Sequence, residues 1–140
     1  MGGKVAILYP SVVMAVLTIL LLVSMGLRRY AAVARREVNP KYYRTFSDGA
    51  ETETLRKHSR HVQNHFEIPP LFHLAVWGTY IVGDVTPVAV GAAWFFVATR
   101  VAHSFIHLTY NTVIHRFFVF GLGVFTVLFL WLRLLLALGA

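Results

Sequence analysis

The chain of 140 residues contains no cysteine and only six acidic residues, against 13 lysines and arginines. Without cysteine it forms no disulfide, offers no thiolate to a metal ion and supports no thioredoxin-like chemistry. Charged residues of both signs make up only 14% of the sequence, whereas 57% of the residues are hydrophobic. A composition this apolar excludes an ordinary soluble domain and indicates a membrane protein.

Four long apolar segments predict an all-α integral membrane protein, a bundle of four transmembrane helices. The segments cover about 5–27, 66–82, 88–108 and 117–138. The first carries no charge and exceeds the roughly 20 residues that a helix needs to cross about 30 Å of hydrocarbon. Because one lysine precedes it and no small-residue cleavage site follows, we expect a retained helix rather than a signal peptide. No internal repeat or low-complexity segment divides the chain, so we expect a single domain over residues 1–140.

Basic residues concentrate in the connection between the first two segments, about residues 28–60. Nine of the 13 lysines and arginines lie there: Arg28, Arg29, Arg35, Arg36, Lys41, Arg44, Arg56, Lys57 and Arg60. By the positive-inside rule this connection is a cytoplasmic loop, and four spans then place both termini outside the cytoplasm. The net charge of +7 favours contact with membrane lipid over nucleic acid, because no nucleic-acid recognition motif accompanies it. We expect a multi-pass protein of a bacterial inner membrane.

The second helix is predicted to begin near residues 51–54 and to enter the membrane at the stretch RHVQNHFEIPP. Arg60, Asn64 and Glu67 are four and then three residues apart, so a continuous helix places them on one face. Such residues can form a simple ladder of ion pairs at the membrane surface. A carboxylate at the membrane boundary nevertheless requires a cation or hydrogen-bond donors, so Glu67 is expected to face protein. The proline pair that follows predicts a bend at the same depth.

A second polar set lies on the third helix, where Arg100, His103 and His107 are spaced i, i+3 and i+7 in an otherwise apolar segment. A charge in the middle of a bilayer costs about 2.5 to 3.5 kcal/mol on insertion scales, so Arg100 requires compensation. The short turn at residues 83–87 makes the second and third helices antiparallel neighbours. We therefore expect Glu67 to pair with Arg100.

These motifs resemble those of the MAPEG family, the membrane-associated proteins in eicosanoid and glutathione metabolism. The likeness rests on Arg60, Asn64, Glu67 and Pro70 in RHVQNHFEIPP, and on Arg100 and His103 in RVAH. It extends to the four helices and the large first loop. The resemblance implies a homotrimer that binds glutathione, as a co-substrate, between protomers near the cytoplasmic side. It also implies transfer of glutathione to a lipophilic small-molecule electrophile, or reduction of a lipid hydroperoxide.

The resemblance also assigns roles to residues by their position in these motifs. The expected glutathione-binding residues are Arg60, Asn64, Glu67, Arg100 and His103, and Arg28 and Arg29 are further candidates for the same pocket. Arg116 is an expected catalytic residue, because a cation near a thiol lowers its pKa from about 8.5 and supplies a thiolate nucleophile. His107 is the second catalytic candidate and stands where the family often has tyrosine. The chain also departs from the family pattern at His61, Gln63 and Phe117.

Two other functions remain compatible with the sequence. A member with an altered site could be a non-catalytic lipid-binding or scaffold protein, which would bind glutathione without turning it over. A histidine-box membrane oxygenase is the third alternative, because six histidines lie near one membrane boundary: His58, His61, His65, His103, His107 and His115. Their spacing differs from that of such oxygenases, so no metal site is expected.

Overall fold

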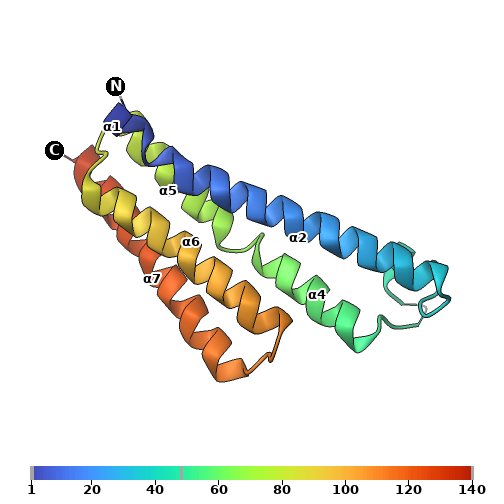
Figure 1. Ribbon diagram of the computed structural model, residues 1–140. Coiled ribbons are helices and arrows are strands. Elements are labelled where there is room, and N and C mark those ends of the chain that lie inside the picture. The colour runs from blue at the N-terminus through green and yellow to red at the C-terminus, as the bar shows by residue number, and fades with distance from the viewer. Residues whose placement is uncertain (1, 48, 140) are drawn as a thin grey trace.

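The computed structural model describes residues 2–47 and 49–139, and within them every regular element is a helix (Figure 1). The helices are α1 (Gly2–Val5), α2 (Leu8–Ala34), α3 (Tyr42–Thr45), α4 (Glu53–Asn64), α5 (Pro69–Val82), α6 (Pro87–Leu108) and α7 (Val113–Leu138). The two ends of the chain lie together at one end of the molecule, and the loop that contains α3 lies at the other.

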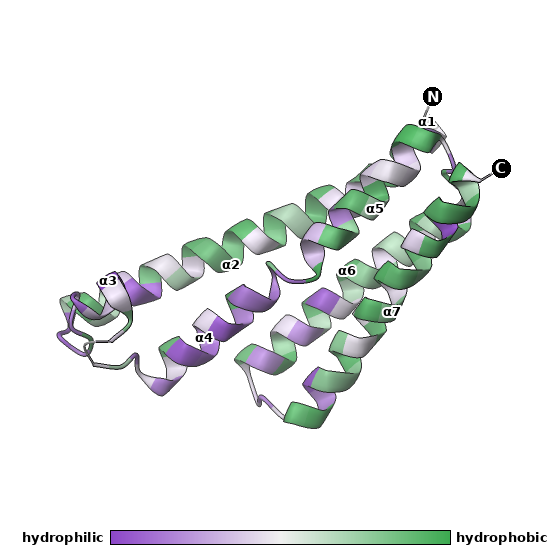
Figure 2. Ribbon diagram, turned by 180° about the vertical axis from the view of Figure 1, so that it is seen from behind, coloured by the Kyte–Doolittle hydropathy of each residue, from purple (hydrophilic) through white to green (hydrophobic). Residues whose placement is uncertain are grey.

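Three helical segments are long and apolar enough to cross a membrane: Gly3–Ala34, Pro87–Leu108 and Val113–Leu138. They correspond to the first, third and fourth predicted spans. In the first and last of them only 28% of the most apolar window is buried inside the protomer, so most of these side chains face outward. Figure 2 shows the contrast between the hydrophobic surfaces of these helices and the hydrophilic α4.

The hydrophobic core lies where α5, α6 and α7 meet α2. Phe72 of α5 stacks on Phe96 of α6, with ring centroids 4.3 Å apart, and Met14 and Leu130 are fully buried in the same cluster. Helices α6 and α7 form the most closely packed pair, α5 packs mainly on α7, and α4 packs on α2 and α6. Of the two helices in the predicted second span, it is therefore α4 that packs on α6, the predicted third span. Helix α4 precedes the apolar segment.

The predicted second helix is two helices rather than one bent helix. Thr52 caps α4 by accepting a hydrogen bond from the backbone amide of Leu55 at 3.4 Å, so α4 begins at Glu53, within the predicted window. It ends at Asn64, and α5 begins at Pro69 after a short turn. Prolines suit the first turn of a helix, where their missing amides would be unpaired in any case. The proline pair thus starts a new helix instead of bending an old one.

This division leaves α5 too short to cross a bilayer alone. Its 14 residues, at about 1.5 Å each, extend about 21 Å, whereas the hydrocarbon core is about 30 Å thick. The predicted span at 66–82 therefore contains no single helix of sufficient length.

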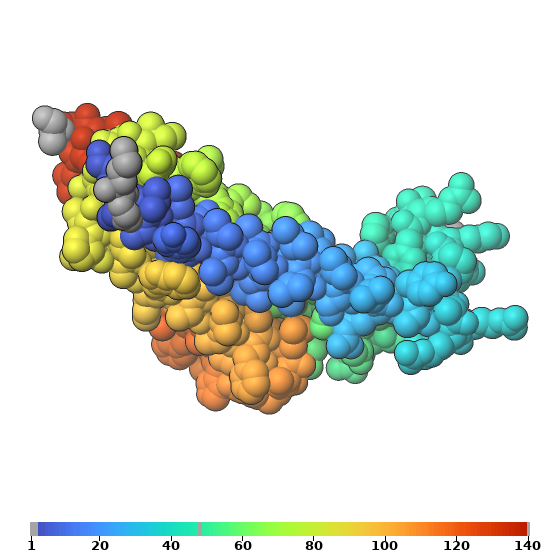
Figure 3. Space-filling view, turned by 45° about the horizontal axis from the view of Figure 1, so that its top comes forward, coloured from blue at the N-terminus to red at the C-terminus, as the bar shows by residue number. Residues whose placement is uncertain are grey.

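The basic loop folds back onto the end of α2. Arg29 pairs with Glu51 at 3.0 Å, donates a hydrogen bond to Ser59 at 2.9 Å, and lies 5.0 Å from the centre of the Tyr43 ring. Burial, and then the nearby Glu51 carboxylate, raise the pKa of the Tyr43 hydroxyl. These contacts fix the start of α4 beside α2, and Figure 3 shows the loop projecting beyond the packed helices.

Candidate functional site

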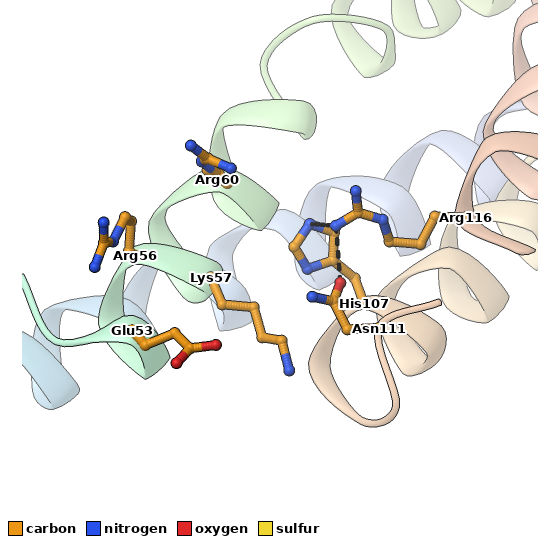
Figure 4. A pocket seen from close by; sticks show the side chains of 7 residues that line it. All are labelled: Glu53, Arg56, Lys57, Arg60, His107, Asn111 and Arg116. Carbon is orange, nitrogen blue, oxygen red and sulfur yellow. Dashed lines mark hydrogen bonds between the residues drawn. The ribbon is translucent and has the colours of Figure 1, made fainter. Parts of the chain in front are cut away.

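A cationic pocket of about 370 Å³ lies between α4 and the junction of α6 with α7 (Figure 4). Its lining residues are Glu53, Arg56, Lys57, Arg60, His107, Asn111 and Arg116. Four of these seven side chains are arginine or lysine and one is a carboxylate. A pocket with this charge balance suits a ligand with more anionic than cationic groups. Its volume lies within the roughly 300–1,000 Å³ typical of small-molecule sites.

Arg116 is held in place from two sides. Its Nη1 atom donates to Oδ1 of Asn111 at 2.8 Å and to Nε2 of His107 at 3.0 Å. Asn111 follows the end of α6 in the left-handed backbone conformation, with φ 55°, and its amide donates to the carbonyl of Ile106 at 2.8 Å. Asn111, in the connection between α6 and α7, therefore also holds the guanidinium of Arg116 at the pocket.

The opposite wall of the pocket comes from α4. Lys57 reaches across to the carbonyl of Thr109, with Nζ and O 3.4 Å apart, and so ties α4 to the end of α6. Arg56 and Arg60 are exposed on the same helix. Of the predicted site residues, the structure brings Arg60, His107 and Arg116 together in this one pocket.

Arg100 does not line the pocket. It also forms no ion pair with Glu67, so the prediction of that ion pair is wrong. Arg100 is only 1% exposed. Its Nη2 donates a hydrogen bond to the carbonyl of Phe120 at 3.2 Å. Its Cζ lies 5.2 Å from the ring centre of Phe96 and 4.9 Å from that of Phe120. A backbone carbonyl and two aromatic faces thus compensate this cation in place of a carboxylate.

Asn64 and Glu67 lie outside the pocket. The break after Asn64 ends the helical register that would have kept Glu67 on the face of Arg60, and the Glu67 side chain is exposed. Neither residue makes a side-chain hydrogen bond within the described chain. The predicted meeting of Glu67 with Arg100 therefore does not occur within the protomer, because Glu67 faces outward; of the three residues, only Arg60 lines the pocket beside His107 of α6.

The face of α4 that does meet α6 carries histidines. The side chain of His61 is fully buried, and its ring stacks on that of His103, with centroids 5.8 Å apart. Burying a neutral imidazole costs much less than burying an arginine or a glutamate, which explains why α4 turns this face inward. His58, also on this face, contacts Ser24 of α2 at 3.3 Å, and burial, followed by Arg28, lowers its pKa. Within residues 2–47 and 49–139, no group of three or more histidine, aspartate or glutamate side chains is arranged to hold a metal ion.

Neither of the two arginines Arg28 and Arg29 of α2 lines the cationic pocket. Arg29 is engaged by Glu51, as described above. Arg28 lines an adjoining cavity of about 180 Å³, which shares Glu53 and Lys57 with the cationic pocket.

Four residues of the pocket were missed in the sequence. Arg56 and Lys57 precede Arg60 by four and three residues, so helical spacing alone puts all three on one side of α4. Asn111 had a signal too, since asparagine shortly after the end of a helix readily adopts the left-handed conformation. Glu53 gave no signal beyond its place in the first turn of a helix.

Comparison with known proteins identifies the family. No curated protein matches the chain. The sequence pattern of the MAPEG family matches residues 7–136, which is nearly the whole chain and includes the α4, α6 and α7 walls of the cationic pocket. The protein therefore belongs to the MAPEG family.

Proposed function

We propose that the protein is a glutathione-dependent membrane transferase or peroxidase that acts on a lipophilic electrophile or a lipid hydroperoxide. The family includes glutathione-related transferases, and the observation that carries the proposal is the cationic pocket. Glutathione has two carboxylates and one ammonium group. The pocket offers Arg56, Lys57 and Arg60 for the carboxylates, Arg116 for the thiol and Glu53 for the ammonium group.

In this proposal Arg116 stabilises the glutathione thiolate. A guanidinium beside a thiol favours the charged form and lowers the thiol pKa from about 8.5 toward neutrality. With an electrophile, the sulfur forms a carbon–sulfur bond as the leaving group departs. With a hydroperoxide, the sulfur takes the terminal oxygen as the O–O bond breaks, and the alkoxide leaves as the alcohol after taking up a proton. A second glutathione then attacks the resulting sulfenic acid, which gives the disulfide and water. His107 and Asn111 keep the guanidinium in position, since both accept hydrogen bonds from the same nitrogen.

The remaining predicted ligands belong to a larger, shared site. Arg60, Asn64 and Glu67 follow one another along the outer surface of the protomer, and we infer that a second protomer of a homotrimer closes the site over them. Glu67 would then hold the glutathione ammonium group from the far side. Arg100 and His103 support the site from inside the bundle.

The same proposal includes the membrane topology. Helix α5, the turn before it and the end of α4 together make the fourth crossing, and the basic end of the molecule faces the cytoplasm. Both termini then lie outside the cytoplasm of a bacterial inner membrane, at the opposite end of the bundle (Figure 1). The pocket opens near the cytoplasmic boundary.

A calorimetric titration of the detergent-purified protein with glutathione, followed by conjugation of a generic electrophile, tests the proposal. One charge-assisted hydrogen bond contributes about 1.5–3 kcal/mol, so Arg60→Ala or Glu67→Ala should weaken binding by roughly 10-fold to 100-fold. His58→Ala is the matched control, because His58 lies on the inner face of α4. Equal binding by all three variants would count against the site. Arg116→Ala should lower the conjugation rate more than binding, and an unchanged rate would remove Arg116 from the mechanism.

The second candidate function is lipid binding without catalysis. A groove of about 480 Å³ along α2 favours it, lined by Leu20, Val23, Ser24, Leu27, Arg28 and Ala31. Apolar side chains along a membrane helix that end at an arginine suit an acyl chain with an anionic headgroup. Glutathione binding with no conjugation of any electrophile would favour this function over the transferase.

A further inference from the structure

Four histidine side chains pack together between α4 and α6, directly behind the cationic pocket. The ring of His61 lies 4.9 Å from that of His65 and 4.9 Å from that of His107, measured between centroids. His103 completes the group at 5.8 Å from His61 and 5.7 Å from His107. None of the four residues is more than 3% exposed. We call this group the histidine cluster.

Most nitrogens of the histidine cluster have no hydrogen-bond partner within the described chain. These are both ring nitrogens of His61, both of His103 and Nδ1 of His107. His65 is better satisfied, with Thr18 Oγ1 at 3.3 Å and Ser104 Oγ at 3.4 Å. The cluster therefore has acceptor sites for protons. Its rings lie almost wholly out of contact with water, and His107 stands at the edge, where it lines the cationic pocket.

The charged groups around the histidine cluster are cations. Lys57 comes from α4, Arg100 from α6 and Arg116 from α7. Helix α2 contributes the hydroxyl groups of Thr18 and Ser24, together with Arg28 near His58. No histidine of the cluster forms an ion pair within residues 2–47 and 49–139. A proton added here would meet the charges of Lys57, Arg100 and Arg116. The one carboxylate that lines the adjoining pocket, Glu53, forms no ion pair with these histidines within the described residues, so the closed arrangement disfavours imidazolium.

The protonation state of His107 is coupled to the position of Arg116. A guanidinium only donates hydrogen bonds, so Nε2 of His107 must accept the bond from Arg116. His107 is therefore neutral in this arrangement and carries its proton on Nδ1. A second proton at Nε2 would remove the acceptor and repel the guanidinium, so Arg116 would lose one of its two anchors.

Helix α4 lies outside the hydrophobic core of α2, α5, α6 and α7. It is separated from α5 by the turn that contains His65 and Glu67, and α5 starts independently at Pro69. Toward α2, α4 is held by the hydrogen bond from Arg29 to Ser59. Toward the end of α6, a hydrogen bond from Lys57 to Thr109 adds to the contacts of the histidine cluster. The attachment to α2 and the turn after Asn64 are therefore the points about which α4 can turn away from α6.

We propose that the histidine cluster is an acid-operated switch, in which protonation moves α4 away from α6, frees Arg116 and disassembles the cationic pocket. This inference rests on the proposed function, because it describes regulation of the same pocket. The direction follows from linkage. The closed form keeps the histidines neutral, whereas an open form exposes them to water, so acid favours the open form.

The absence of cysteine makes a direct test practical. Two cysteines introduced at exposed positions, Gln63 on α4 and Ile114 on α7, carry spin labels, and pulsed dipolar spectroscopy measures their separation. Labelled protein is mixed with excess unlabelled protein, so that each assembly holds one labelled chain. As pH falls from about 7.5 to about 5, across the usual histidine pKa, the distance distribution should shift reversibly to longer values.

Two histidine variants assign the shift. H61Q/H103Q should lose it or move it to lower pH, whereas H115Q should retain it, because His115 is exposed and outside the cluster. A wild-type distance that does not change with pH would overturn the proposal, and so would an unchanged shift in H61Q/H103Q or its loss in H115Q. If H61Q/H103Q does not fold, the wild-type titration alone decides. Glutathione is absent throughout, so a failed shift leaves the proposed function intact, and a failed glutathione titration leaves the shift interpretable.

Discussion

The position of the Arg100 guanidinium can be tested by adding one methyl group to a facing helix. At Gly123 of α7, an added Cβ would lie 3.0 Å from Oγ1 of Thr99 and 3.1 Å from Cζ of Arg100, and closer still to its Nη2. Real Cβ atoms essentially never approach that closely, so Gly123→Ala must displace the guanidinium or separate α6 from α7. Displacement would also disturb its hydrogen bond to the carbonyl of Phe120.

The expected cost follows from these contacts. Overpacking a close helix contact costs about 1–3 kcal/mol, and weakening a hydrogen bond from a charged donor adds up to about 1.5–3 kcal/mol. Alanine recovers about 1 kcal/mol over glycine within a helix. We expect a net destabilisation of about 2 kcal/mol. For a chain of this length that corresponds to a fall of roughly 4–8 °C in the unfolding temperature, followed by tryptophan fluorescence in detergent.

Two other glycines serve as matched controls. At Gly121, on the same helix, and at Gly26 on α2, an added Cβ meets nothing within 4 Å. Alanine at either position should leave the unfolding temperature unchanged or raise it slightly, through helix propensity alone.

A double-mutant cycle identifies the group responsible. In an Arg100→Met background the guanidinium is gone, so the cost of Gly123→Ala should fall sharply. An equal cost with and without Arg100 would refute the contact on which the reasoning depends, and so would an alanine at Gly123 that is tolerated as well as one at Gly121.

Two further predictions concern the loop and pH. Glu51→Gln removes the buried partner of Arg29, so trypsin should cleave the loop after α2 faster than in the wild type. Glu37→Gln is the control and should have no effect, because the ion pair of Glu37 is exposed. Equal cleavage of both variants would contradict the role of the Glu51 carboxylate. Burial lowers the pKa of His58 in the folded protein. As pH falls below about 6.5, the unfolded chain therefore binds a proton at this residue before the folded chain does. The free energy of unfolding should then fall by up to about 1.4 kcal/mol per pH unit for this group. His58→Gln should reduce the pH dependence of the unfolding temperature, and His115→Gln should not. The reverse pattern would show that the burial of His58 does not govern this pH dependence.

Much of the helical arrangement could be predicted because it depends on local signals. Charge-free length marked the first span, and the threonine and acidic residues near 51–54 marked the start of α4. The break between α4 and α5 was harder to predict. A proline pair inside an apolar pattern fits a bent helix as well as a new helix, and the choice depends on what the turn before it contacts in three dimensions.

The site could be predicted only in part, for a physical reason. Spacing correctly placed Arg60 on one side of a helix, but it could not show whether that side faces the bundle or away from it. The buried residues lie on one side of the same helix: Leu55, His58, His61, Val62 and His65. Rotation of α4 was decided by the lower cost of burying neutral rings, which a search for charged residues overlooks.

The shortage of acidic residues explains why the pocket is so strongly cationic. Within the described residues three carboxylates are used in ion pairs, with Arg29 and Arg35 at the basic end and with Arg133 at the end near the termini. Arg100, in the bundle, is compensated by a carbonyl and aromatic rings instead. Few carboxylates then remain to neutralise the arginines and lysine that converge on the pocket from α4 and α7. An anionic ligand supplies the negative charge that the pocket lacks, so its binding should weaken as the salt concentration rises. The ion pair between Arg29 and Glu51 should be less affected, because the Glu51 carboxylate is buried.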